Sequence, residues 1–370
     1  MKLKTKRNLF ATVILSSSAL ILSACSSDDV ATTEHYNGPG SKWDIVLNPD
    51  NTFHIDHRPS VSDPIDYTVD GNYTRNASGF ISMTVTGGTG VNAPSVGSEA
   101  WALEVPGYAF MLKPVDSEQL IAMVTAGSCP TEDFDANWVI VKKDTSGGSA
   151  NATDPNRDFV GTFSFDAETS APSLPITKAL STGFPTVIGG GLTGSASCAD
   201  GIMTLSGAVM YLTANGGAIV HTDGGTPGNE TDDSFIFGLG QSALTNISET
   251  DGNYAGMLFD DNQSGGNKLL PVSLSCISGT CIGTIVTDVT TGAASSDTVT
   301  VVLSNSINEI GGTPVDGFIT GTIDDGLGGV GNMACMADPD AAGSGKKIVN
   351  CVGQSPGDND EMFNVLFVSI

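Results

Sequence analysis

The chain has 370 residues, of which 41 are acidic and 15 basic, so its formal net charge is −26. A field of that sign repels nucleic acid and excludes nucleic-acid binding, and 46 glycines beside only 15% charged residues favour strands and turns. A chain of this length exceeds what one hydrophobic core usually supports, so we expect two domains.

Residues 1–24 have the parts of a secretory signal peptide. Three lysines and Arg7 form a basic start, and an apolar run extends from Leu9 to Leu22. That run of about 14 residues is too short for a transmembrane helix, which needs roughly 20. Small residues follow it, as they do before a signal-peptide cleavage site.

The end of this segment, Leu22-Ser23-Ala24-Cys25, resembles the lipobox of bacterial lipoproteins. The resemblance implies cleavage by signal peptidase II before Cys25, which would then carry a diacylglycerol on its sulfur and a palmitate-like chain on its amine. Several acyl chains anchor a protein stably to a membrane. In that family an aspartate at position 26 favours the inner membrane, so Ser26 implies the cell outer membrane. The protein would face the periplasm or the cell surface. An ordinary signal peptide with a chance cysteine is the alternative.

Composition divides residues 25–143 into a polar tether and a β domain. Residues 25–41 are polar and rich in small side chains, and we predict an acylated cysteine followed by a flexible tether. Residues 42–143 are predicted to form a small N-terminal β-barrel or sandwich, because apolar residues alternate with polar ones between turn-forming residues. The alternating runs lie at 42–48, 52–56, 65–73, 79–87, 99–107, 118–126 and 136–143.

The start of this domain is similar to the first hairpin of lipocalin-like barrels. Those barrels carry a Gly-x-Trp motif, and here Gly40 and Trp43 stand one residue further apart. The resemblance implies a small barrel, in which we expect Trp43 to plug the core rather than to gate a ligand.

Residues 144–158 are predicted to be a linker, because they are rich in Gly, Ser, Asn and Asp. Residues 159–370 are predicted to be a larger C-terminal β domain of antiparallel strands, as one body or two. One short helix is expected within 173–184. The overall prediction is an all-β chain with two antiparallel β domains.

Six cysteines follow Cys25, and an even number behind a secretion signal indicates disulfides. Two pairings are local in sequence. Cys276 and Cys281 flank a four-residue turn, and Cys335 and Cys351 flank a loop whose closure would contribute about 3 kcal/mol. Cys129 and Cys198 then remain for each other. Zinc is disfavoured because the chain has no Cys-x-x-Cys pair.

Two motifs contain candidate metal ligands or titratable side chains. In "HIDH", a strand would place Phe53 and Ile55 inside and leave His54 and Asp56 facing water. Asp260, Asn262 and Ser264 present oxygen atoms at alternate positions before a glycine, as calcium loops do, although no EF-hand glutamate follows. The last set is a speculative calcium site, and no other cofactor is expected.

These observations favour a lipid-anchored envelope or cell-surface lipoprotein that is not an enzyme. We expect a module that binds a partner or maintains the envelope. Its partners would be the membrane, through the lipid anchor, and an unidentified protein or small molecule. The alternative is an envelope enzyme that acts on glycan or peptide through loop carboxylates, which would require two carboxylates in one cleft.

Overall fold

The computed structural model describes residues 32–38, 42–59, 63–117, 119–125, 127, 129–142, 159–165, 177–180, 187–189, 196–199, 201–205, 208–213, 218–222, 234–260, 268–324, 329–354 and 362–370. Nearly all of these residues are in antiparallel strands, and two short 3-10 helices are the helical elements among them. No helix in these ranges has the length and apolarity needed to cross a membrane. Residues 33–370 form one compact unit.

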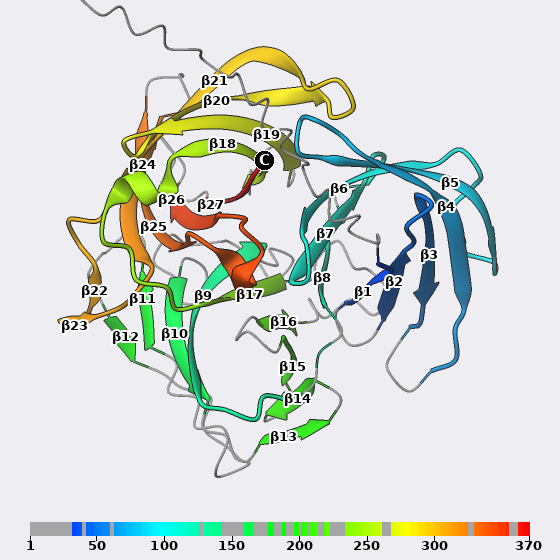
Figure 1. The fold of residues 1–370 in the computed structure, drawn as a ribbon, viewed down its shortest axis with the longest axis horizontal. Coiled ribbons are helices and arrows are strands. Elements are labelled where there is room, and N and C mark those ends of the chain that lie inside the picture. Colours follow the sequence, from blue (N-terminus) through cyan, green and yellow to red (C-terminus); the bar gives the residue numbers. More distant parts are fainter. Residues whose placement is uncertain are drawn as a thin grey trace, which may run out of the picture. The chain divides into compact units, whose positions relative to one another are not determined.

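The first body is a closed barrel in which eight strands pair in chain order (Figure 1). Its strands are β1 (Glu34–Asn37), β2 (Trp43–Leu47), β3 (Thr52–His57), β4 (Tyr67–Arg75), β5 (Ile81–Thr89), β6 (Glu99–Val105), β7 (Ala109–Pro114) and β8 (Ile121–Thr125).

The alternation of the sequence builds this barrel. On β2, Trp43, Ile45 and Leu47 are buried while the residues between them are half-exposed. Strands β6 to β8 are buried on both faces, and β7 therefore begins with a continuous apolar run, Ala109 to Leu112. Such a run has no period-two signal, so the sequence pattern does not identify β7 as a separate strand.

The second body is a nine-stranded sheet in the order β12-β11-β10-β9-β17-β16-β15-β14-β13. Its strands are β9 (Phe134–Lys142), β10 (Phe159–Phe165), β11 (Thr177–Leu180), β12 (Val187–Gly189), β13 (Ala196–Ala199), β14 (Ile202–Leu205), β15 (Ala208–Leu212), β16 (Ala218–Thr222) and β17 (Ser234–Gly240). The helix expected within 173–184 is wrong at Thr177–Leu180, because these residues pair with β10 as a strand.

The third body is a second closed barrel of eight strands, with one small hairpin inserted between β21 and β24. Its elements are η2 (Ile247–Thr250), β18 (Gly252–Asp260), β19 (Lys268–Ile277), β20 (Thr280–Asp288), β21 (Ala293–Ser304), β22 (Glu309–Ile310), β23 (Thr313–Pro314), β24 (Phe318–Asp324), β25 (Val330–Asp338), η3 (Ala341–Gly343), β26 (Ile348–Gln354) and β27 (Met362–Ser369).

One hydrophobic cluster includes side chains from all three bodies. It contains Leu103 of the first barrel, Phe237 of the sheet and Leu366 of the second barrel, each almost completely buried. The hydroxyl of Tyr108 also donates a hydrogen bond to the backbone carbonyl of Gly238 in the sheet. The outer faces of β6 to β8 therefore lie in a shared core, which explains why they are apolar.

The prediction of an all-β chain with two antiparallel β domains is confirmed, with closed barrels as the observed form. Two predicted boundaries need correction. Glu34–Asn37, placed in the tether at 25–41, form β1 because they pair with β2 and close the barrel against β8. The linker at 144–158 lies outside the described residues, but it connects β9 and β10, which pair with each other in the sheet. Residues 134–142 therefore belong with the sheet rather than with the domain at 42–143.

Candidate ligand-binding pocket in the first barrel

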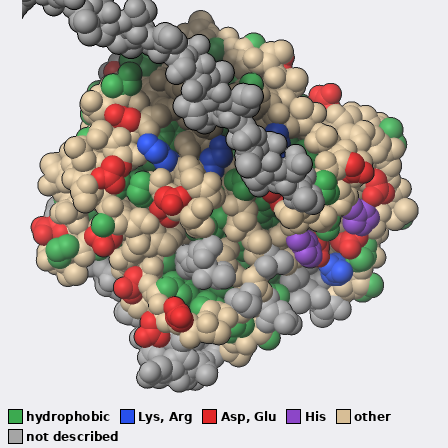
Figure 2. Space-filling model, viewed as in Figure 1, with side chains coloured by type: hydrophobic (Ala, Val, Ile, Leu, Met, Phe, Trp, Pro, Cys, Tyr) green, Lys and Arg blue, Asp and Glu red, His purple; other side chains and the backbone are tan. Residues whose placement is uncertain are grey.

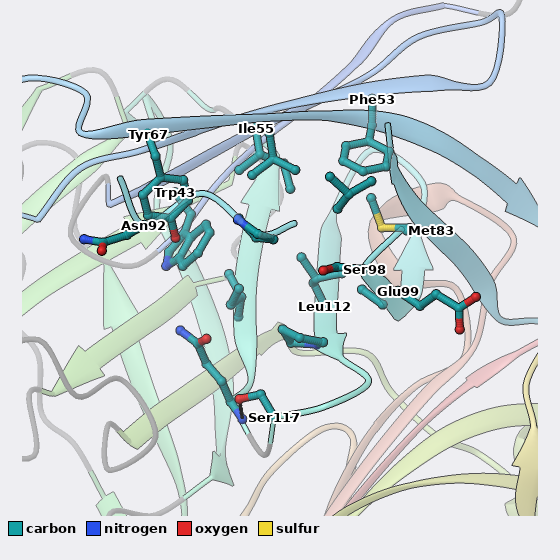
Figure 3. A pocket seen from close by; sticks show the side chains of 17 residues that line it. Trp43, Phe53, Ile55, Tyr67, Met83, Asn92, Ser98, Glu99, Leu112 and Ser117 are labelled. Atoms are coloured by element: carbon teal, nitrogen blue, oxygen red, sulfur yellow. Dashed lines mark hydrogen bonds between the residues drawn. The ribbon is translucent and has the colours of Figure 1, made fainter. Parts of the chain in front are cut away.

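The interior of the first barrel contains a pocket of about 300 Å³ (Figure 3). Ligand sites for single small molecules begin at about this size, and eight-stranded barrels are wide enough to hold one small ligand. The pocket is lined by Trp43, Phe53, Ile55, Tyr67, Val69, Met83, Val85, Asn92, Pro94, Ser98, Glu99, Ala100, Leu112, Pro114, Ser117, Gln119 and Ile121.

The floor of the pocket is apolar because it consists of the inward positions of the strands. Ile55, Val69 and Met83 stand on three successive strands, and each is buried. Gly71 has no side chain, and a Cβ placed there would lie 2.4 Å from the ring of Phe53. The absence of that atom leaves room for the Phe53 ring inside the barrel.

Three rings form a ladder across β2, β3 and β4 at the mouth. Trp43, His57 and Tyr67 are cross-strand neighbours. The centroid of the His57 ring lies 4.5 Å from that of Trp43, and the two rings are tilted. The His57 and Tyr67 rings are stacked, with their centroids 4.3 Å apart. Asp66 fixes the imidazole, because its Oδ1 lies 2.7 Å from His57 Nδ1. Trp43 and Tyr67 line the pocket, so Trp43 is a wall of the site as well as a part of the core.

Four of the described residues that line the mouth have polar, uncharged side chains. Asn92 and Ser98 belong to the loop between β5 and β6, and Ser117 and Gln119 belong to the loop between β7 and β8. Glu99 is also at the wall, but β6 turns its side chain outward, and Figure 3 shows it pointing away from the pocket.

Exposed aliphatic side chains occur on the loops at this end of the barrel. Ile65 precedes β4, Val91 and Val96 lie between β5 and β6, and Val115 follows β7. Val91 is fully exposed and Val96 is 72% exposed. Exposed apolar groups around a concave site are typical of binding surfaces.

The opposite end of the barrel is closed by an ion cluster. Arg75 donates two hydrogen bonds to the Glu104 carboxylate, at 2.7 and 2.9 Å, and one to Glu34 Oε2 at 2.5 Å. Tyr36 also donates to Glu104, at 3.0 Å. Partial burial, together with a hydrogen bond to Glu104, raises the pKa of Glu34 to about 7. Burial opposes ionisation of Glu104, but the bonds from Arg75 prevail and hold its pKa below the usual value.

The other histidine pairs of the barrel lie on its outer face. His54 Nδ1 is 2.6 Å from Asp70 Oδ1, and His54 Nε2 is 3.1 Å from Asp56 Oδ1. His35 pairs with Asp44. Figure 2 shows histidines beside acidic side chains on this face. The predicted outward orientation of His54 and Asp56 agrees with this arrangement, whereas the role of His57 at the mouth could not be read from "HIDH" alone.

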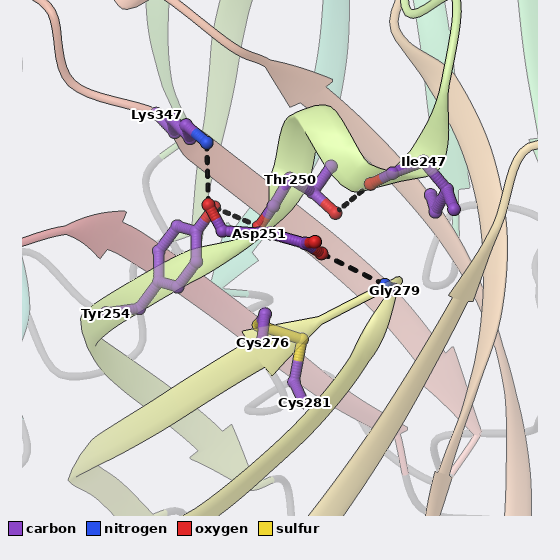
Figure 4. Close-up of a disulfide and its surroundings, with 8 residues drawn as sticks. All are labelled: Ile247, Thr250, Asp251, Tyr254, Cys276, Gly279, Cys281 and Lys347. Carbon is purple, nitrogen blue, oxygen red and sulfur yellow. Dashed lines mark hydrogen bonds between the residues drawn. A yellow bond between two sulfur atoms is a disulfide. The ribbon is translucent and has the colours of Figure 1, made fainter.

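The structure joins the cysteines as Cys129–Cys198, Cys276–Cys281 and Cys335–Cys351. The two local pairs are those that the spacing favours, and both lie inside the second barrel. The Cys276–Cys281 bridge joins two directly paired residues of β19 and β20 (Figure 4). Beside it, the Gly279 N–H donates to Asp251 Oδ1 at 3.2 Å, which fixes the turn against η2.

The remaining predicted site residues fall mostly outside the described part of the chain. Cys25, Asn262 and Ser264 are not among the described residues. The backbone of Asp260 ends β18 and pairs with Lys268 and Phe363. The calcium site and the lipid anchor therefore stay predictions. None of the pocket residues was identified as a site from sequence, because each looks like an ordinary core or loop position.

No protein-family model and no curated protein matches the sequence. Among solved structures, a double mutant of transferrin-binding protein B from Haemophilus parasuis matches with 14% identity and a TM-score of 0.27, over 89% of this chain and 66% of that one. Isotype 1 transferrin-binding protein B from serogroup B Neisseria meningitidis matches with 10% identity and a TM-score of 0.29, over 88% and 64%. The chain thus spans about two thirds of their length. Resemblance at these TM-scores carries no argument about this site, whose interpretation rests on its own geometry.

Proposed function

We propose that the chain is a lipid-anchored protein of the outer envelope that binds a small apolar ligand inside its first barrel, without catalysing a reaction on it. The observation that supports the binding function is the pocket of about 300 Å³ with its apolar floor and the four uncharged polar residues at its mouth. Pockets that combine an apolar lining with a few polar groups at one end are typical of small-molecule sites.

The proposed anchor is the acylated Cys25, with the outer membrane as the location. Its support is the lipobox-like sequence together with the position of β1. Glu34 opposes Leu47 at the closed end of the barrel, so the chain enters the barrel away from the mouth. The segment from Cys25 to Glu34 can span at most about 30 Å.

The catalytic alternative is less well supported by the carboxylates of the described chain. An enzyme that acts on glycan would place two carboxyl groups on either side of a bound substrate. Glu34 and Glu104 instead share Arg75 at the closed end, and neither lines the pocket. We therefore propose a binding role, and turnover of any substrate in a broad panel of glycans and peptides by the purified chain would refute it.

Binding can be tested with N-phenyl-1-naphthylamine, a neutral apolar dye that fluoresces in apolar surroundings. The wild-type chain should bind one dye molecule. The variant Val85→Trp should bind none, because the added ring fills the pocket that Val85 lines. Val330→Trp is the matched control, since Val330 is 65% exposed at the start of β25 in the second barrel. Equal dye binding by wild type and Val85→Trp, with both folded by circular dichroism, would refute a site in this barrel.

The anchor has its own test. Cells that express wild type or Cys25→Ala are labelled with radioactive palmitate, and membranes are separated from soluble protein. The wild type should take up label and sediment with outer membranes, and the variant should do neither. A variant that still takes up label and remains with membranes would show that the anchor has been misassigned.

A further inference from the structure

We propose that the ligand of the first barrel is an uncharged amphiphile, with an apolar body on the barrel floor and one neutral polar head held at the mouth by Ser98 and Asn92. This inference rests on the proposed binding function and adds the chemical class of the ligand. It follows from which side chains face the pocket and from which of them lack hydrogen-bond partners.

The first step is the absence of inward charge among the lining residues. Among the described lining residues the one carboxylate, on Glu99, points outward (Figure 3), and no lysine or arginine is in that described set. The nearby Asp66 already bonds to His57. A charged head would lose its hydration at this mouth without gaining an ionic partner, and such desolvation strongly opposes binding.

The second step is the set of neutral polar residues that line the mouth, where Asn92 is exposed and Ser98 is half-buried. The Ser98 hydroxyl and the Asn92 amide make no hydrogen bond within the described part of the chain, and Figure 3 shows Ser98 pointing into the pocket. The Ser117 hydroxyl accepts from the Gln119 N–H at 3.0 Å, which leaves its own proton to donate. These groups can both donate to and accept from a hydroxyl, ester or amide head.

The third step is the size of the ligand, which the volume of the pocket limits. At ~30 Å³ for a water-sized group, the pocket accommodates on the order of ten such groups. An eight-carbon chain with a small head fits that space. The matched probes 1-octanol, octanoate and octyltrimethylammonium share the chain and differ in the charge of the head.

The test measures the binding of these three probes to the full chain carrying Cys25→Ala by isothermal titration calorimetry at neutral pH. We expect 1-octanol to bind at least about tenfold more tightly than either charged probe. Ser98→Ala should weaken 1-octanol binding by about threefold to tenfold, the effect of one hydrogen bond. Ser95→Ala is the matched control, because Ser95 is in the same loop and does not line the pocket.

The outcomes separate this inference from the proposed function. If none of the probes binds and the dye does not bind either, the pocket is no ligand site and both proposals fail. If the dye binds but octanoate or octyltrimethylammonium equals or exceeds 1-octanol, only the neutral-head inference is overturned. Equal 1-octanol affinity in Ser98→Ala and Ser95→Ala would remove Ser98 from the recognition of the head.

Discussion

At the scale of single residues, Glu34 is the side chain whose charge the fold controls most clearly. Its pKa is raised to about 7 from the ordinary value of 4.5, so the folded state favours the protonated acid. The stability that this preference contributes is complete below pH 4.5 and is lost as the pH rises through about 7. The pKa of Glu104 is instead lowered from its ordinary value of 4.5. The stability that Glu104 contributes is therefore lost only as the pH falls below 4.5, outside the range in which Glu34 titrates.

Glu34→Gln should therefore remove part of the pH dependence between pH 5 and 8. The amide imitates the protonated acid, so we expect a melting temperature on the order of 2 °C above wild type at pH 8 and a clearly smaller gain at pH 5. Thermal unfolding followed by circular dichroism measures both. Glu99→Gln, at an exposed glutamate, should change neither value. A gain of equal size at both pH values would show that charge is not its cause.

The pKa of His54 is also shifted by the fold, and this group titrates over a different range of pH. The hydrogen bond to Asp70 raises the pKa of His54 above the ordinary 6.5. Its contribution to stability is present below pH 6.5 and disappears as the pH rises through the folded-state pKa. NMR titration of the imidazole should give a pKa above 6.5 in wild type and a lower pKa in Asp70→Asn. An unchanged pKa in that variant would exclude Asp70 as the cause.

At the scale of elements, β1 is the shortest strand of the first barrel, with four residues. It has four register pairs with β2 but only two with β8. Arg75 on β4 compensates, because it joins Glu34 of β1 to Glu104 of β6. One guanidinium and two carboxylates thus supplement the backbone pairing of β1 with β2 and β8 that closes the barrel.

Arg75→Met should loosen β1 before any other strand. The change leaves the Glu104 side chain, which is 6% exposed, without its cation. Because the Arg75 side chain is 44% exposed and solvent screens the pair, we expect a loss of about 1–3 kcal/mol. Hydrogen exchange should speed up at the backbone amides of Tyr36 and Asn37 and less at those of β2 and β3. Arg75→Lys should recover part of the protection, since it restores the charge but not the forked geometry. Uniform acceleration across the barrel would argue against a local latch.

The sequence pattern predicts some strands of this fold and misses others. Period-two runs identify strands such as β2 and β4, whose two faces meet different surroundings. The same pattern cannot separate β7, which is buried on both faces, or β1, which is four residues long and largely polar. The pocket is beyond local sequence for a similar reason. Met83 and Leu112 look like ordinary core residues, and only barrel closure shows that a space remains between them.

At the scale of the whole molecule, the shared core predicts that the three bodies unfold together. Leu103, Phe237 and Leu366 belong to one buried cluster although they come from different bodies, so the unfolding of one body would expose apolar surface on the others. This coupling extends to the pocket, because Leu112 on its wall and Met111 in the shared core are neighbours on β7.

The three tryptophans allow a direct test of this coupling. Trp43 and Trp101 are in the first barrel and Trp138 is in the sheet, so fluorescence does not report directly on the second barrel, whereas far-ultraviolet circular dichroism reports on all strands. We expect the two signals to change at the same urea concentration. Leu103→Ala should move both midpoints together, with a loss of about 2–5 kcal/mol. A fluorescence transition at lower urea, followed by a separate one in circular dichroism, would show that the barrels unfold independently and that the cluster does not couple them.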